Sequence, residues 1–185
     1  MNRNLLKWIL IAAVILGAAA YLILSERPSN KERIVVGNSK AFKIEPVEGI
    51  TISAPENALD KDREFKLSPV DDKTYDKVTK AYENTYIKPL FVFEFDAGLK
   101  PDEHLPGDVD VVWDLDKMGI PRELQDQFVV YRGAGSGKSL EYLRYKTHLD
   151  NGKLSFKSNQ NSVIIGALAV VGGITMAIQV GRRIF

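Results

Sequence analysis

Two long apolar segments without charge constrain this chain most, and every acidic residue lies between them. The first segment covers residues 8–24 and the second covers residues 163–180. A transmembrane helix needs about 20 mostly apolar residues to cross a hydrocarbon layer about 30 Å thick. The sequence therefore predicts a helix in the membrane on either side of one folded domain.

Basic residues lie on the outer side of both apolar segments. Arg3 and Lys7 precede the first segment, and Arg182 and Arg183 follow the second. Positively charged flanks stay on the cytoplasmic side of a membrane. We therefore expect a two-pass protein of the cell membrane, with an extracytoplasmic middle domain. The predicted cytoplasmic parts are residues 1–7 and residues 181–185.

Each apolar segment also allows a second interpretation. Three alanines at residues 18–20 could be the cleavage site of a signal peptide, although the apolar run continues to Leu24. The second segment is rich in glycine and contains Gln179. If residues 163–167 formed a strand of the domain, only 13 residues would remain before Gly181, too few to span at about 1.5 Å each.

Small residues are spaced four apart in both predicted membrane helices. Ala169, Gly173 and Ala177 form one such stripe, and Ala13 and Gly17 form a shorter one. Small residues at this spacing let two helices approach closely. The stripes predict that the two helices pack on each other, on a partner, or on a second copy of the chain.

The charge balance of the middle region argues against nucleic acid as a partner. The chain has 25 basic and 24 acidic residues, and the four basic flanking residues leave the middle with a net charge of −3. A nucleic-acid-binding domain carries a basic face instead. The chain has no cysteine, which excludes disulfides, thiolate metal sites and cysteine nucleophiles.

Alternation of apolar and polar residues predicts that the middle region is mainly β. The clearest case is residues 108–116, where Val109, Val111 and Trp113 alternate with aspartates. Similar short patterns cover residues 50–53, 64–68, 91–95, 128–131, 140–145 and 154–156. Helical spacing is confined to residues 72–83 and 121–127.

These patterns predict an antiparallel, Ig-like β-sandwich with one or two short helical insertions, flanked by N- and C-terminal transmembrane helices. Residues 25–46 are expected to form a juxtamembrane linker and a first strand. The sandwich itself is expected to cover residues 47–162.

The order of strands and turns from Gly49 onward resembles a known β-sandwich family. It starts with a Gly-led strand, then Pro55, the pair Ala58-Leu59, and a second strand at residues 65–67. Residues 47–163 are similar in this way to the module shared by zonula occludens proteins, netrin receptors and ankyrins, which bacterial surface proteins also contain. The resemblance implies a non-enzymatic sandwich that contacts other proteins.

Some members of that family cleave themselves before the serine of a His-Phe-Ser sequence. The matching residues here are Gln160, Asn161 and Ser162. Glutamine cannot act as a general base, so the departure from the pattern argues against self-cleavage of this chain.

The run GAGSGKS at residues 133–139 resembles a phosphate-binding loop. That motif requires a glycine at position 132, which is Arg132 here, and no parallel αβ pattern surrounds the run. A glycine-rich turn between two strands is the interpretation we adopt.

Few residues suggest a metal or catalytic site. Asp102, Asp108 and Asp110 are candidates for weak calcium binding, because hard cations prefer carboxylate oxygens. A solvent-facing strand surface explains the same acids. His104 and His148 are the two histidines, and neither has the spacing of a triad or metal motif.

We therefore expect a protein that is not an enzyme and has no cofactor. The predicted function is a membrane-anchored extracytoplasmic interaction or structural module, a subunit of a cell-envelope complex that binds other envelope or surface proteins. The alternative is an adhesion or ligand-sensing module for a glycan or cation, with Tyr82, Tyr86 and Tyr145 as contact residues. A third alternative is an enzyme or self-processing domain, which would use His104 or His148 with one of the loop acids, or Ser162 as nucleophile.

Overall fold

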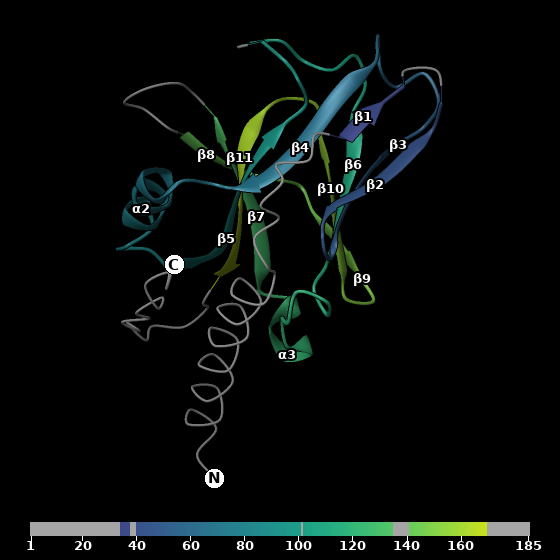
Figure 1. Cartoon of the computed structure of the whole chain (residues 1–185). Helices are drawn as coiled ribbons and strands as arrows, with labels where there is room; N and C mark the ends of the chain where they lie inside the picture. Colours follow the sequence, from purple (N-terminus) through teal and green to yellow (C-terminus); the bar gives the residue numbers. More distant parts are fainter. Residues whose placement is uncertain (1–33, 38–39, 101, 135–140, 170–185) are drawn as a thin grey trace.

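The computed structural model describes residues 34–37, 40–100, 102–134 and 141–169, which form two packed β-sheets with two short helices (Figure 1). Every strand pair that the sheets contain is antiparallel. The prediction of a mainly β sandwich is confirmed.

The six-stranded sheet has the strand order β1-β4-β5-β11-β7-β8. Its strands are β1 (Ile34–Val36), β4 (Arg63–Pro69), β5 (Ile87–Asp96), β7 (Phe128–Ala134), β8 (Glu141–Arg144) and β11 (Ser162–Ala169). The five-stranded sheet has the order β2-β3-β6-β10-β9. Its strands are β2 (Phe42–Val47), β3 (Ile50–Ala54), β6 (Val109–Asp114), β9 (His148–Asp150) and β10 (Lys153–Ser158).

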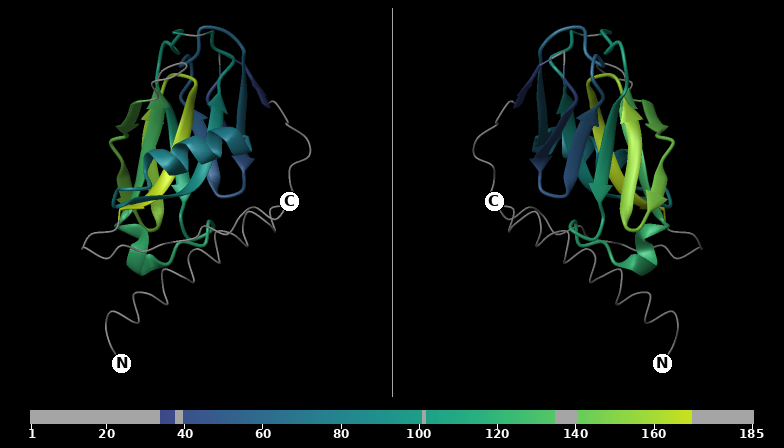
Figure 2. Two further views of the ribbon diagram at one scale, coloured as in Figure 1. Left: turned by 90° about the vertical axis from the view of Figure 1, so that its left-hand side faces the viewer. Right: turned by 90° about the vertical axis from the view of Figure 1, so that its right-hand side faces the viewer.

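Helix α2 (Asp72–Ala81) lies on the outer face of the six-stranded sheet, and α3 (Arg122–Gln125) lies at one end of the sandwich (Figure 1). Figure 2 shows α2 crossing the six-stranded sheet in its left view. The right view shows the five-stranded sheet with no helix in front of it. Both helical insertions were predicted from sequence, with ends that differ by a few residues.

The core lies between the two sheets and is centred on Trp113 of β6, which is fully buried. Its ring lies among four phenylalanines: Phe91, Phe93, Phe128 and Phe156. A Cβ atom on Gly166 of β11 would lie 2.3 Å from Cζ3 of Trp113. Glycine at this position therefore lets the indole reach the backbone of the opposite sheet.

The predicted transmembrane helix over residues 163–180 is wrong in its first part. Residues 163–169 belong to β11, which pairs with β5 on one side and β7 on the other. Both faces of β11 are buried, one against the second sheet and one against α2, so its sequence is apolar throughout. A continuous apolar run does not distinguish a strand of this kind from a helix.

The helix-packing stripe that begins at Ala169 is wrong for the same reason. Ala169 is the last residue of β11 and pairs with Ile87 of β5. The other members of the predicted stripes lie outside the described residues: Ala13, Gly17, Gly173 and Ala177. Within the described ranges, no helix combines the length and the apolar character that a membrane crossing requires.

The sandwich extends past both of its predicted limits. β1 and most of β2 lie in residues 25–46, for which a linker and one strand were predicted, and β11 continues to Ala169, beyond the predicted limit of the sandwich at residue 162. β7 and β8 pair as a hairpin from Ala134 and Glu141, so the first two residues of the GAGSGKS run, Gly133 and Ala134, belong to β7; the rest of the run lies outside the described residues. A strand rather than a helix therefore follows the GAGSGKS run, which a phosphate-binding loop does not allow.

Candidate binding site

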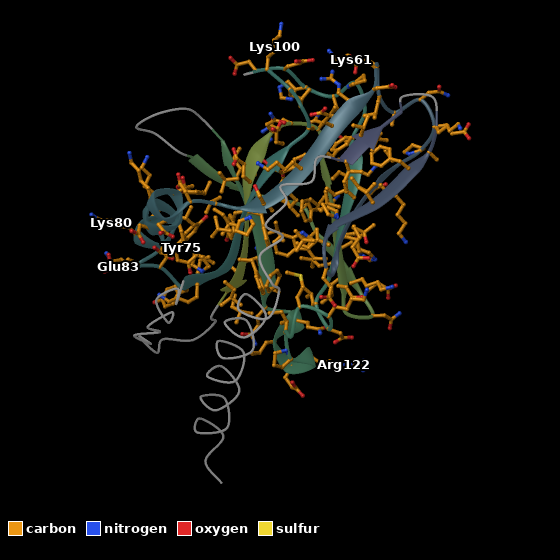
Figure 3. The ribbon with its side chains drawn as sticks, viewed as in Figure 1. Lys61, Tyr75, Lys80, Glu83, Lys100 and Arg122 are labelled. Atoms are coloured by element: carbon orange, nitrogen blue, oxygen red, sulfur yellow. The ribbon has the colours of Figure 1, made fainter. Side chains whose placement is uncertain are left out.

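The outer face of the six-stranded sheet is covered by α2. Val78 and Tyr82 point from the helix to the sheet and are buried. They pack against buried residues of the strands and their connections: Val70, Val92, Val129, Ile165 and Ala167. Figure 3 shows Lys80 of α2, and Glu83 just after the helix, pointing away from the sheet. This face is therefore a second, smaller core.

The outer face of the five-stranded sheet instead carries mostly polar side chains. One row crosses four neighbouring strands and consists of Thr51, Val112, Ser155 and His148. The next row contains Ser53, Asp110 and Lys157. All of these side chains are half-buried or exposed. Because strand residues alternate between faces, the same strands send Ile52, Val111 and Phe156 into the core.

A hollow of about 570 Å³ opens at one edge of this polar face. It lies between β10 and the segment that leads from β8 to β9. Its lining residues are Asp110, Tyr145, Lys146, Thr147, His148, Ser155, Phe156 and Lys157.

The turn between β9 and β10 decides which backbone groups of β10 face the hollow. Asn151 and Gly152 both have positive φ, 46° and 76°, as a two-residue type I′ turn requires. Such a turn places a hydrogen-bonded pair directly beside it, here Asp150 and Lys153. Because the pattern repeats every second residue, the N–H and C=O of Lys157 point to the β9 side of β10.

β9 and β10 separate before they reach Lys157. Their pairing ends at Ser155 and His148, so Lys146 is the residue that would come opposite Lys157 in a longer ladder. No hydrogen bond joins the backbones of these two residues, both of which the structure describes. Within the part of the chain that the structure describes, the strand position beside β10 at Lys157 is therefore vacant, and the hollow lies at this position.

Tyr145 lines the hollow on the side opposite this strand position. Its ring lies 4.5 Å from the ring of Phe156, measured between centroids. Its hydroxyl is within hydrogen-bond distance of Ser158 Oγ, at 3.2 Å, and its backbone N–H donates to the Val130 carbonyl at 2.9 Å. Contacts to both sheets fix the tyrosine, so the hollow is a formed feature of the sandwich.

Positive charge predominates in the hollow. Lys146, Lys157 and His148 face one acid, Asp110, so the formal charge of the lining is +1 with the histidine neutral. Among the described residues, no ion pair or side-chain hydrogen bond engages the charged groups of these four side chains. The cationic groups are thus available to an anionic ligand.

The predicted calcium ligands are not gathered in one place. Asp102 lies in the loop before β6, Asp108 is exposed directly before β6, and Asp110 lies on the outer face of that strand. Across the ranges that the structure describes, no three His, Asp or Glu side chains form a group suited to a metal ion. Asp110 lines the hollow instead.

The two histidines and Ser162 lie in different surroundings. His104 is exposed in the loop before β6, whereas His148 is exposed at the start of β9, beside the hollow. The Ser162 hydroxyl is buried at the start of β11 and has no hydrogen-bond partner. A serine nucleophile needs a base within hydrogen-bond reach, and none contacts this hydroxyl.

The three tyrosines expected to contact a ligand do not share one surface. Tyr82 is buried under α2, and burial raises the pKa of its phenol. Tyr86 is 67% exposed in the connection between α2 and β5. Tyr145 alone lies at the hollow.

A buried arginine at the other end of the sandwich was missed by the sequence analysis. Arg63 is 3% exposed and pairs with Asp60 and Glu103, each at 2.9 Å. Hydrogen bonds from Arg63 hold the pKa of Asp60 below its usual range. The backbone N–H of Lys100, followed by Arg63, does the same for the pKa of Glu103. The cluster joins two loops, at the end where Figure 3 labels Lys61 and Lys100.

Comparison with known proteins adds no relative. No model of a known protein family matches the sequence. No curated protein matches it either.

Proposed function

We propose that this chain is a membrane-anchored interaction module of the cell envelope. Its Ig-like sandwich stands on the extracytoplasmic side and binds another envelope or surface protein through the outer face of the five-stranded sheet. The observation that carries the proposal is the contrast between the two outer faces. One is closed by a helix, and the other is polar and has a hollow at its edge.

One anchor is sufficient for this proposal. The uncharged residues 8–24 would form a helix of about 25 Å, close to the thickness of the hydrocarbon layer. The uncharged residues that follow β11, 170–181, would reach only about 18 Å as a helix. We therefore assign the membrane anchor to residues 8–24, with Arg3 and Lys7 on the cytoplasmic side.

A short connection keeps the sandwich near the membrane. Nine residues, 25–33, separate the anchor from β1, and an extended chain of that length reaches about 30 Å. A module held at this distance meets membrane-bound partners at a high effective concentration, so even a modest interface is sufficient. Contact with other proteins is also what the resemblance of residues 47–163 to the zonula occludens, netrin receptor and ankyrin module implies.

Site-specific photo-cross-linking in intact cells tests the proposed face. A photo-reactive residue at Val112, the centre of the open face, is expected to yield one adduct with an envelope protein, identified by mass spectrometry. The same residue at Lys77, exposed on α2, is the matched control and is expected to yield none. Equal labelling at both positions, or no adduct at Val112, would overturn the proposal.

Topology is tested separately. A tag before Arg3 is expected to be protected from protease added to spheroplasts, while the sandwich is digested. Digestion of both, or protection of both, contradicts an extracytoplasmic module with a cytoplasmic N-terminus.

A further inference from the structure

We infer that the hollow beside β10 takes an acidic, extended peptide segment of the partner protein, which adds as a short strand next to Lys157. The inference rests on the proposed function and specifies the chemistry of the partner. It combines two independent features of the hollow: its vacant strand position, and its positive charges, which no ion pair engages among the residues that the structure describes.

The vacant strand position supplies main-chain hydrogen bonds. The N–H and C=O of Lys157 point to the side of β10 where β9 has already ended. Extended peptides commonly bind by adding to such an edge, and their main-chain bonds give affinity without requiring a particular sequence. Lys146, from the segment between β8 and β9, lines the same hollow as Lys157.

The side chains select an acidic segment. Lys157, Lys146 and His148 all line the hollow, and Asp110 is the acid opposite Lys157 on β6. Carboxylates on alternate residues of an added strand would face the same side as these cations, because strand side chains alternate between faces. Complementary charge of this kind sets specificity and the association rate.

A peptide fits this site better than an acidic glycan. A glycan offers no repeating N–H and C=O groups at the spacing of a strand, and the rings at the hollow do not form a stacking platform. The Tyr145 ring already packs on Phe156, and the hydroxyl of Tyr145 contacts Ser158. The glycan remains one of the outcomes that the experiment distinguishes.

Binding is measured with the full-length protein in lipid nanodiscs, by fluorescence anisotropy of a labelled eight-residue peptide that alternates Glu and Thr. The same peptide with Lys in place of Glu is the first control. We expect saturable binding of the acidic peptide only, with an affinity that falls as salt is added. No binding of the acidic peptide, or equal binding of the basic one, would overturn the inference.

Charge-reversal variants locate the site. Lys146→Glu and Lys157→Glu are each expected to lower the affinity for the acidic peptide by about tenfold. Lys43→Glu, which makes the same charge change on β2 at the opposite edge of the same sheet, is expected to change affinity by less than about twofold. An equal effect of all three variants would show general attraction to a charged surface and contradict the site.

Backbone methylation of the peptide tests strand addition without altering the protein. Methylating the amides of one edge of the acidic peptide, which would face Lys157, is expected to abolish binding, whereas methylating the other edge is expected to leave it unchanged. If neither or both matter, strand addition is wrong. Tight, competing binding of an oligoglucuronate would show an acidic-glycan site instead.

The two proposals fail separately. Loss of peptide binding with a retained Val112 adduct removes the acidic-strand site and leaves the interaction module. Peptide binding without any Val112 adduct keeps the site and removes the proposed partner face.

Discussion

The two sheets of this sandwich share one core, but their outer faces are used differently. On the six-stranded sheet, β5 and β11 are buried on both faces, because α2 closes the outer one. On the five-stranded sheet, β6 and β10 are buried on one face only. The difference shows that the pattern of a strand reports how many of its faces are covered. The polar, uncovered face is the one that we propose as the partner-binding surface.

The largest expected effect concerns the core that both sheets share. We expect Gly166→Val to destabilise the protein by about 3 kcal/mol, because even a Cβ at this position meets Trp113 Cζ3 at 2.3 Å and Phe128 Cζ at 2.7 Å. Urea denaturation of the purified protein measures the change. Ser155→Val, on the open face of β10, is the control and is expected to stay within about 0.5 kcal/mol of the parent. Similar values for the two variants would mean that Gly166 does not pack against the indole.

A pair of identical substitutions compares the two outer faces directly. Val92→Thr places a hydroxyl between β5 and α2, where the side chain is 5% exposed, and is expected to cost about 1.5 kcal/mol. Val112→Thr makes the same change on the half-buried face of β6 and is expected to be neutral within about 0.5 kcal/mol. Both strands favour threonine and valine, so backbone propensity cancels in the comparison. Equal costs, again measured in urea, would show that the five-stranded face is covered as well.

The same distinction explains what the sequence could predict. Where one face is solvated, the alternation is visible, as in residues 108–116, and β6 lies where the pattern places it. α2 was equally visible, because Tyr75, Val78 and Tyr82 repeat at helical spacing. Residues 163–169 carried no such signal, because a strand covered on both sides has no polar positions to reveal its period.

The hollow could not be predicted from the sequence, for a different reason. Asp110 and Lys157 are neighbours only because β6 pairs with β10. No local sequence pattern predicts the residue at which the pairing of β9 and β10 ends. Asn-Gly is a common sequence for a type I′ turn, and the turn at Asn151-Gly152 fixes which backbone groups of β10 point to the β9 side once the pairing is known. Arg63 was missed in the same way, since Glu103 lies 40 residues away in the chain.

The smallest expected effect concerns a defect in the covered face. The Tyr82 hydroxyl is buried and has no hydrogen-bond partner, although the Tyr82 ring packs against Tyr131 and Tyr142 at centroid distances of 5.6 and 5.2 Å. Removing an unsatisfied buried hydroxyl relieves its desolvation penalty, so Tyr82→Phe is expected to stabilise the protein by about 1 kcal/mol at pH 7. Thermal unfolding measures the shift, and Tyr86→Phe, at an exposed position, is the neutral control.

The dependence of stability on pH above neutrality gives a second test of the Tyr82 prediction. Burial raises the pKa of the Tyr82 phenol in the folded protein above that of the unfolded chain. The folded state therefore favours the neutral phenol. Ionisation of this group leaves the free energy of unfolding unchanged below about pH 10, the ordinary pKa of tyrosine, and lowers it as the pH rises further. The parent protein should lose stability above pH 10 more steeply than Tyr82→Phe does. Parallel alkaline curves for the two proteins would show that the phenol reaches water, and that α2 covers its sheet less completely than the packing around Val78 indicates.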